Sequence, residues 1–571
     1  MVTDAAVCAL TRYIGTSRVN IVSEPSPYPQ KATEKSLNVG IQSALLLRNS
    51  LQTTSSAYSA PSPDGKYVAT LLPPGIAIRS VLSLGIDRTI KLASDLPGGV
   101  TSLSWSPSST RVLVTIGDQF HVFSAPGGDF HGLVQVPQPP GTKSAFASFG
   151  ATDDEVCVFS PLGIKLTIFN LVSSKAVEIG NPKFFSIVAA LKGCSFRPCT
   201  HHLALLTRTA GRDMVSIHSA DTREIQRSWY PETIDAQGLS WTPDGRWLVV
   251  WDSPAHGTRV LFCTHDGHVY KDWRGDLPHS ASDDGMGPYA PGVKTLAFSP
   301  NGRYTAAADG SNCIPIFNDR LVEEVRLHHA PTVEPKETLQ IWQEQIELRA
   351  GQRAIPSFIK ATQAVSPPGL SPNSISDTRY GCNLAKFDSS SSLLASRLDD
   401  APSTIWIWDV PSSELRAVIM YHANVTKVEW HPSKPELLLM RCEGEEYSGL
   451  VFVWDPLSSG PCPIEFSRHL PSAKVTGRTD ATWLGTITKS AALFFTDHAK
   501  YILASLADTD LDAEEALPWT TQAAVNSHVN MDTPKDFDIS NNDSDNNNST
   551  DLDEAITELD DTFHFKKSPV P

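Results

Sequence analysis

The sequence lacks several features by which membrane, secreted and disulfide-rich proteins are commonly identified. Its 571 residues contain no run of about 18 apolar residues, so we expect no membrane-spanning helix. The N-terminus has no basic region followed by an apolar stretch, which argues against secretion. Nine cysteines are scattered without a Cys-x-x-Cys pair, a usage that suits reduced thiols in the cytosol or nucleus.

Motifs of common catalytic and nucleotide-binding sites are also missing. We find no nucleophile elbow, no Walker A loop, no Gly-x-Gly-x-x-Gly after a strand and no His-Glu-x-x-His. No block of lysine and arginine with interleaved aromatic residues occurs, and a net charge of −16 repels phosphate. We therefore predict that the protein is not an enzyme, holds no cofactor and binds no nucleic acid.

The sequence does contain a hairpin pattern that recurs along the chain and is clearest at residues 238–252. Leu239 and Trp241 alternate with polar neighbours, as expected for a strand packed on one face. Residues 242–245 (Thr-Pro-Asp-Gly) then form a turn signal, in which proline presets φ and glycine accepts a positive φ. Residues 247–251 are an apolar run of strand length, so the segment predicts an antiparallel hairpin.

Nine copies of this hairpin can be aligned on the position of Trp241. Successive copies are 44, 44, 47, 45, 57, 89, 43 and 53 residues apart. A period of about 40–45 residues built from short strands is the signature of WD40-type propeller blades. We therefore predict an all-β fold, one closed ring of eight or nine WD40-type blades. The aligned positions are Pro61, Trp105, Phe149, Phe196, Trp241, Phe298, Phe387, Trp430 and Trp483.

The Trp-Asp pairs that close the third strand of a WD40 blade are mostly degenerate. Trp408-Asp409 and Trp454-Asp455 occupy that place, about twenty residues after the turn. Trp251-Asp252 lies earlier, in the predicted second strand. Gly-His pairs at blade starts are missing almost throughout. We therefore expect apolar packing, rather than the usual buried Asp-His network, to hold the blades together.

Charge and composition divide the chain into three parts. Residues 1–35 are polar and carry no blade signal, so we predict a flexible segment. Residues 36–505 are predicted to form the propeller, with a strand from 36–56 closing the ring against the last blade. Residues 506–571 are predicted to be a disordered acidic tail. Residues 505–571 hold 16 Asp and Glu against three lysines, a net charge of −13.

A long insertion at about 319–380 interrupts the regular spacing of the copies. Within it, residues 339–348 fit both a helical stripe and a strand. The insertion is either a disordered spacer or a loop on the binding face, and the sequence leaves both open. Trp342, Trp273 and Arg274 are the candidate partner-binding residues, because they are predicted to lie in long connections rather than in the hairpins.

Four Ser/Thr-Pro sites lie in segments predicted to be flexible. Proline-directed kinases accept such sites, and phosphate would add local negative charge. Composition typical of disorder is the alternative explanation for each of them. The four candidate phosphosites are Ser366, Ser371, Thr533 and Ser568.

One four-residue cluster has the residue types of a zinc site. Cys194, Cys199, His201 and His202 form a Cys-x4-Cys-x-His-His pattern, and thiolate and imidazole both ligate zinc. Cys194, however, occupies the inward-facing strand position that Leu239 takes in its own copy. We therefore expect ordinary hairpin residues here and no metal.

Six segments carry a resemblance to a known family: Ser62–Tyr67, Gly238–Asp252, Leu261–Gly267, Val293–Tyr304, Thr404–Val410 and Leu450–Pro456. The most specific of their features is the out-of-register Trp-Asp at Trp251-Asp252. Together they resemble the WD-repeat proteins of the centrosome and fungal spindle pole body that help to anchor microtubule minus ends.

The resemblance implies a non-catalytic scaffold at the microtubule-organising centre, in the cytoplasm and cytoskeleton. Its implied partners are a coiled-coil anchoring protein and, in yeast members, a minus-end-directed kinesin. Two other classes remain open. One is a propeller subunit of translation-initiation or other RNA-linked complexes. The other is a ubiquitin-ligase substrate receptor, although Trp408-Asp409 and Trp454-Asp455 lack the arginine that such receptors carry two residues after the aspartate.

Overall fold

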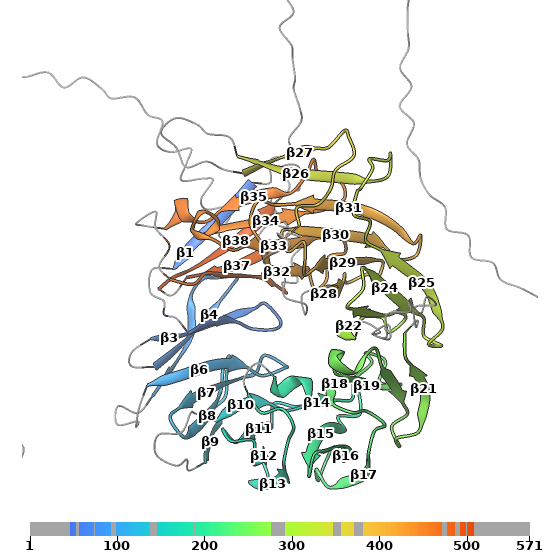
Figure 1. The fold of residues 1–571 in the computed structure, drawn as a ribbon. Helices are drawn as coiled ribbons and strands as arrows, with labels where there is room; N and C mark the ends of the chain where they lie inside the picture. The colour runs from blue at the N-terminus through green and yellow to red at the C-terminus, as the bar shows by residue number, and fades with distance from the viewer. Residues whose placement is uncertain are drawn as a thin grey trace, which may run out of the picture.

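The protein is an all-β propeller. The computed structural model describes residues 46–507, except 53–55, 57, 73–74, 93–98, 137–144, 187–188, 276–291, 347–355, 370–380, 471–474, 476, 486–490 and 498. The described residues form nine sheets arranged in sequence order around one centre, so the predicted fold is confirmed with nine blades (Figure 1). No α-helix occurs in these ranges, and none of their helical turns could cross a membrane.

Each blade is built on four strands, of which the first faces the ring centre and the fourth lies farther out, and the seventh sheet has two more (Figure 1). In the ninth blade, β1 supplies the fourth strand. The strands, blade by blade from the inside outward, are β2 (Ser59–Pro61), β3 (Tyr67–Leu72), β4 (Gly75–Ser80), β5 (Ile86–Lys91); β6 (Val100–Trp105), β7 (Arg111–Ile116), β8 (Gln119–Ser124), β9 (His131–Gln135); β10 (Phe146–Phe149), β11 (Glu155–Phe159), β12 (Lys165–Asn170), β13 (Lys175–Gly180); β14 (Cys194–Phe196), β15 (Leu203–Thr209), β16 (Arg212–His218), β17 (Ile225–Trp229); β18 (Ala236–Trp241), β19 (Leu248–Asp252), β20 (Val260–Cys263), β21 (Val269–Trp273); β22 (Val293–Phe298), β23 (Thr305–Asp309), β24 (Cys313–Phe317), β25 (Glu323–His328); β28 (Cys382–Phe387), β29 (Leu393–Leu398), β30 (Thr404–Asp409), β31 (Glu414–Met420); β32 (Val425–Trp430), β33 (Leu438–Cys442), β34 (Leu450–Trp454), β35 (Cys462–Glu465); and β36 (Asp480–Leu484), β37 (Ala491–Thr496), β38 (Tyr501–Ala507), β1 (Leu46–Gln52).

The short helical turns are all of the 3-10 type. They lie in connections between strands, at η1 (Ala190–Lys192), η2 (Pro254–His256), η4 (Glu445–Tyr447) and η5 (Ser467–His469).

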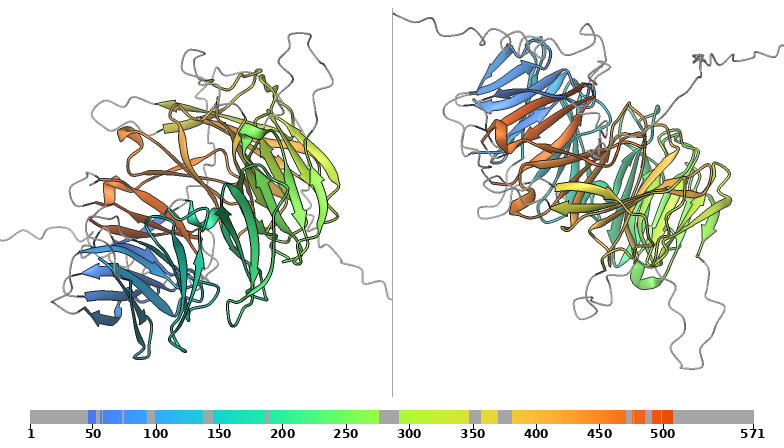
Figure 2. Two further views of the ribbon diagram at one scale, coloured as in Figure 1. Left: turned by 60° about the horizontal axis from the view of Figure 1, so that its bottom comes forward. Right: turned by 90° about the horizontal axis from the view of Figure 1, so that it is seen from above.

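The first strand of the chain closes the ring, as predicted. β1 pairs antiparallel with β38, and the register joins Leu46 to Ala507 and Gln52 to Tyr501. Figure 1 shows this blue strand beside the last strands, and Figure 2 shows the same blade from two further sides. The propeller therefore ends at residue 507 rather than 505. The predicted flexible segment 1–35, and the predicted tail beyond its first two residues, lie outside the described residues.

All nine aligned hairpin copies fall at the ends of inner strands, which confirms the register of the repeat. In the clearest copy, the Gly245 N–H donates to the Thr242 carbonyl over 2.8 Å. The Thr242 hydroxyl accepts the Trp247 N–H over 3.1 Å. Gly245 has φ of 66°, the left-handed conformation for which glycine was expected. Trp241 is buried between the fourth and fifth blades.

The out-of-register Trp-Asp pair lies at the end of β19, a second strand, as predicted. A Cβ on Gly238 would come within 2.2 Å of the Trp251 ring, so only glycine fits beneath this indole. The Asp252 carboxylate accepts the backbone N–H groups of Ile234 and Asp235 over 2.8 and 2.7 Å. The pair thus orders the connection that enters the fifth blade.

The two regular Trp-Asp pairs end the third strands β30 and β34, where they were predicted. The seventh blade also keeps a histidine relay that the sequence analysis did not identify. Trp408 Nε1 donates to Ser396 Oγ over 2.8 Å, and Ser396 Oγ lies 2.9 Å from His329 Nε2. His329 Nδ1 lies 2.9 Å from the Asn312 carbonyl. Burial lowers the pKa of His329 to about 4, so this imidazole is neutral at physiological pH.

The apolar core of the described residues is divided into nine clusters, one at each interface between neighbouring blades. Each cluster takes side chains from the facing sheets of two blades, because one four-stranded blade cannot bury both of its faces alone. Packing of this kind supports the expectation that apolar contacts hold the blades together.

The insertion contributes a hairpin to the seventh blade. β26 (Gln340–Ile346) runs parallel to β31 and antiparallel to β27 (Pro356–Lys360), so this sheet has six strands. Of the two readings left open for residues 339–348, the strand is therefore correct up to residue 346. Glu344 fixes the hairpin to the eighth blade, because its buried carboxylate accepts the Tyr447 hydroxyl over 2.9 Å and the His422 N–H over 2.7 Å.

Candidate functional site

The inner strands of the ring differ in charge from one side to the other. Those of the first five blades, β2, β6, β10, β14 and β18, contain no charged residue. Those of the last four blades, β22, β28, β32 and β36, all do. The charged residues on these four strands are Lys294, Lys386, Lys427, Glu429 and Asp480.

These charged side chains connect neighbouring blades. Lys294 Nζ lies 2.5 Å from an Asp399 carboxylate oxygen of the next blade. Lys386 Nζ donates to the Val428 carbonyl over 2.9 Å. Burial lowers the pKa of Lys386, and the carbonyl partner satisfies only part of its donor capacity. The last four blades therefore present charge close to the ring centre.

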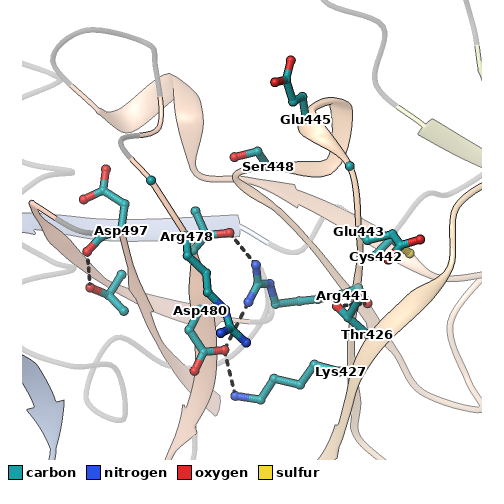
Figure 3. A pocket seen from close by; sticks show the side chains of 14 residues that line it. Thr426, Lys427, Arg441, Cys442, Glu443, Glu445, Ser448, Arg478, Asp480 and Asp497 are labelled. Atoms are coloured by element: carbon teal, nitrogen blue, oxygen red, sulfur yellow. Dashed lines mark hydrogen bonds and ion pairs between the residues drawn. The ribbon is translucent and has the colours of Figure 1, made fainter. Parts of the chain in front are cut away.

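A pocket of about 730 Å³ opens on this side, between the eighth and ninth blades (Figure 3). It lies at the end of the blades opposite the turns that follow the inner strands. Its volume falls in the usual range for ligand sites in proteins. It is lined by Thr426, Lys427, Arg441, Cys442, Glu443, Gly444, Glu445, Ser448, Gly477, Arg478, Thr479, Asp480, Thr496 and Asp497.

Basic side chains converge on one carboxylate in this pocket (Figure 3). Asp480 Oδ1 lies 3.1 Å from Lys427 Nζ and 3.1 Å from Arg441 Nη1. Arg441 Nη2 also donates to the Thr479 hydroxyl. Arg441 Nε is buried and has no hydrogen-bond partner among the described residues. Burial lowers the pKa of Arg441, partly offset by Asp480, and the nearby Arg478 charge lowers it further.

Two of the acidic residues around the pocket are engaged elsewhere. Glu443 accepts from the Asn424 side-chain amide. Asp497 accepts the N–H groups of Ala499 and Lys500 within its own turn, over 2.8 and 2.6 Å. The lining of the pocket thus combines three cations, Lys427, Arg441 and Arg478, with four carboxylates, including that of Glu445.

A second pocket, of about 700 Å³, lies between the third and fourth blades. It contains a buried pair in which the Arg223 guanidinium donates to both Glu155 carboxylate oxygens. The Arg223 Nη1 group also donates to the His201 carbonyl over 2.7 Å. Because its central charges already satisfy each other, we regard this second pocket as a structural feature that joins two blades.

The predicted partner-binding residues do not lie where they were expected. Trp342 is in β26 and Trp273 in β21, so both are in strands rather than long connections. Both indoles are buried, Trp342 between the seventh and eighth blades and Trp273 between the fifth and sixth. Arg274 follows β21, is 68% exposed and pairs with Asp272 over 2.9 Å. A partner-binding role stays a prediction, and Arg274 is the candidate with an accessible side chain.

Of the four candidate phosphosites, only Ser366 falls within the described residues. Its side chain is exposed, and its hydroxyl lies 3.0 Å from that of Thr332. Ser371, Thr533 and Ser568 lie outside the described residues, so phosphorylation stays a prediction for all four.

The cysteine-histidine cluster is dispersed rather than gathered. Cys194 points into the core between the third and fourth blades, where burial raises the pKa of its thiol to about 12. Cys199 is exposed in the turn after β14. In the part of the chain that the structure describes, no group of three or more His, Cys, Asp or Glu side chains is placed to hold a metal ion.

Comparisons with known proteins identify WD-repeat homologues. The chain is 24% identical to the WD repeat-containing protein WRAP73 of Mus musculus over 417 residues, which are 69% of this chain and 84% of that protein. It is 21% identical to an uncharacterized WD repeat-containing protein of Schizosaccharomyces pombe over 396 residues, 67% of this chain and 76% of that protein. No protein-family model matches the chain.

Two solved structures are similar to this chain at low identity. A crystal structure of the eukaryotic initiation factor is 11% identical, covers 73% of this chain and 90% of its own, and has a TM-score of 0.48. The Dos1 propeller is 11% identical, covers 72% of this chain and 93% of its own, and has a TM-score of 0.41. At these values the likeness carries no argument about function.

Proposed function

We propose that this chain is a non-catalytic WD-repeat adaptor at the microtubule-organising centre, acting in minus-end anchoring and spindle organisation. It recruits a coiled-coil anchoring protein, with a minus-end-directed kinesin as a further partner. The observation that carries the proposal is the similarity to WD repeat-containing proteins over 69% of the chain. The family resemblance of the six segments, with its out-of-register Trp251-Asp252 pair, supports the cellular location.

Two features of the ring suit an adaptor. Its nine blades offer wide faces made of connections, on which side chains can vary without disturbing the core. The inner strands of the last four blades carry charge, and complementary charge gives protein interfaces their orientation and specificity. We therefore assign partner docking to the ring itself, with Arg274 as a candidate contact on the fifth blade.

The first test is co-precipitation of the tagged full-length chain with mass spectrometry, paired with imaging in dividing cells. We expect a coiled-coil protein in the precipitate and the tag at spindle poles. RNA-dependent recovery of initiation factors would favour the RNA-linked class instead, and recovery of ubiquitin-ligase subunits would favour a substrate receptor. A tag that never reaches spindle poles would contradict the proposal.

A second test uses a matched pair of exposed arginines. Arg274→Glu should reduce partner recovery, whereas Arg246→Glu, also exposed and paired with a neighbouring aspartate, should leave it unchanged. Equal recovery with both variants would remove Arg274 from the interface. Deleting the insertion is not a clean test, because it would remove β26 and β27, and with them Trp342, and uncover the core against which Trp342 packs.

A further inference from the structure

A small cavity lies between the fourth and fifth blades, separate from the two pockets described above. It has a volume of about 240 Å³ and lies at the end of the blades that carries the turns after the inner strands. Sites for drug-sized ligands usually measure roughly 300–1,000 Å³, so this cavity suits a single side chain. Among the described residues, no acidic side chain lines it. The lining residues are Arg197, His202, Ile217, Gln226, Trp241 and His265.

Arg197 is held in this cavity with its charge unpaired. Its Nε donates to the Gly245 carbonyl of the fifth blade over 2.7 Å, and its guanidinium carbon lies 5.2 Å from the centre of the Trp241 ring. No carboxylate of the described residues pairs with it. These contacts use the Nε–H group and one face of the guanidinium. The terminal N–H groups of Arg197 are therefore left as a fork for an incoming acceptor.

Trp241 makes different contacts from the other tryptophans at the aligned position. Three of those indoles donate to a backbone carbonyl on the inner strand of the preceding blade, over 2.8 to 3.0 Å. Trp241 Nε1 has no hydrogen-bond partner among the described residues, and its ring supports Arg197 instead. The interface between the fourth and fifth blades therefore differs from three other interfaces at the point where the cavity lies. The three paired indoles are Trp105, Trp430 and Trp483, and their acceptors are Ala60, Lys386 and Glu429.

We propose that this cavity binds the carboxylate of one aspartate or glutamate side chain of a protein partner. A carboxylate presents two oxygens that match the guanidinium fork of Arg197, and no acidic lining residue of the described chain competes for it. A phosphorylated side chain carries about −1.5 to −2 charges at neutral pH. Arg197 is the one described lining residue that is permanently charged, so it would balance a carboxylate fully and a phosphate only in part.

The position of the cavity suits a side chain presented by another protein. It lies beside turns of the fourth and fifth blades, so the rest of the partner can rest on the turns around it. The inference deepens the proposed adaptor role, because it names the chemistry of one partner contact. It is tested on the purified chain, so its failure and a failure of the protein to reach spindle poles are separate results.

Methyl NMR of the full-length chain, labelled at the isoleucine δ1 methyl groups, tests the site, because the buried Ile217 side chain lines the cavity. The loss of one signal in Ile217→Val assigns it. We expect the tripeptide acetyl-Gly-Glu-Gly-amide to shift the Ile217 signal saturably, with a Kd on the order of millimolar. The matching glutamine tripeptide should bind about tenfold more weakly, because it lacks a charged acceptor. No saturable shift, or equal affinity for the two tripeptides, would overturn the proposal.

A matched pair of arginine variants assigns the binding to one side chain. Arg197→Gln should weaken binding of the glutamate tripeptide about tenfold, whereas Arg246→Gln should leave it unchanged. Arg246 lies in the adjoining turn of the fifth blade, is 55% exposed and pairs with Asp244 over 3.5 Å. Isoleucine signals from distant blades show whether each variant is folded; if Arg197→Gln is not, the contrast between the two tripeptides on the wild type still decides. Unchanged binding by Arg197→Gln would contradict the site.

Two further probes separate a partner side chain from other anions. Acetate should bind more weakly than the glutamate tripeptide, because it lacks the flanking backbone that can contact the turns. Acetate binding of equal strength would assign the cavity to free small carboxylates and overturn the partner assignment. The phosphoserine tripeptide should bind no more tightly than the glutamate tripeptide. Binding about tenfold tighter would assign the cavity to phosphorylated segments and overturn the choice of a carboxylate.

Discussion

The first five blades and the last four use the same architecture with different chemistry on their inner strands. On the first five, the inner strands carry hydroxyl, small and aromatic residues and no charge. On the last four, lysine and acidic residues bridge from blade to blade. Both sides bury an apolar cluster at every interface. The packing that builds the ring is therefore shared around it, whereas charge on the inner strands is confined to the last four blades.

The largest effect on stability should come from breaking the apolar packing between two of the first five blades. Trp241→Ala should lower the free energy of unfolding by about 3–5 kcal/mol, because it removes a buried aromatic ring from the core between two blades. Denaturant unfolding measures the change. Leu457→Ala is the matched control, since Leu457 is 94% exposed. A stable Trp241→Ala variant would show that this cluster does not hold the ring.

The next effect concerns the Asp252 carboxylate in the fifth blade, and tests whether it acts only as an acceptor for backbone N–H groups. Asp252→Ala should cost about 2–3 kcal/mol, because it removes a buried carboxylate that accepts the N–H groups of Ile234 and Asp235. Thermal and denaturant unfolding report the loss. Asp266→Ala, at an exposed turn of the same blade, should change the stability by much less. Equal losses in the two variants would contradict this role of Asp252.

A pH titration should report on the interface between the sixth and seventh blades, through the neutral His329, which follows β25 and contacts Ser396 of β29. Its pKa in the folded ring, about 4, lies below the ordinary value of 6.5, so the unfolded chain binds the proton first as pH falls. Stability present at pH 7 is therefore lost between pH 6.5 and 4, and this histidine should contribute about 2 kcal/mol of loss by pH 5. The measurement is the unfolding free energy at pH 7 and 5.

The comparison variant for that titration is His329→Gln. His431 also has a pKa of about 4, lowered by burial, and titrates in the same direction, so only the difference between wild type and variant is informative. If the variant loses as much stability as the wild type between pH 7 and 5, His329 is not the group responsible.

The smallest effect on stability is expected from a charged residue on the inner strands of the last four blades. Lys386→Met should change stability by less than about 1 kcal/mol, because an apolar side chain of similar length offsets the lost contact with the Val428 carbonyl. Chemical unfolding midpoints provide the measurement, with Trp241→Ala as the reference for a packing loss. A cost as large as that of Trp241→Ala would mean that the charges hold the ring together.

Much of the fold could be predicted from the sequence, because each blade carries a local signal. Trp241 and its counterparts sit at the same point of every hairpin, and proline and glycine mark the turn, so one alignment gives nine inner strands and their register. Gly245 has the positive φ that its turn requires. The closing strand was also predictable, because a ring needs a partner for its last blade.

The site was predicted poorly, because its residues meet only through the ring. Lys427 and Arg441 come from the eighth blade and Asp480 from the ninth, and nothing in their spacing indicates that the two cations converge on Asp480. One signal was present: the inner strands carry charge only from β22 onward. Trp342 was misplaced for a related reason. Its strand pairs with β31, more than seventy residues later, a contact that no local pattern shows.

Ring closure by β1 determines when the ring can be completed during synthesis. β1 leaves the ribosome early, yet its partner β38 is completed only when Ala507 has been added, 461 residues after Leu46. At about 5–20 residues per second, this leaves roughly 25–90 s in which β1 has no partner. During that time the unpaired edge of the strand can pair with other chains and aggregate. We therefore expect chaperones to protect mainly the strands that later form the β1–β38 contact.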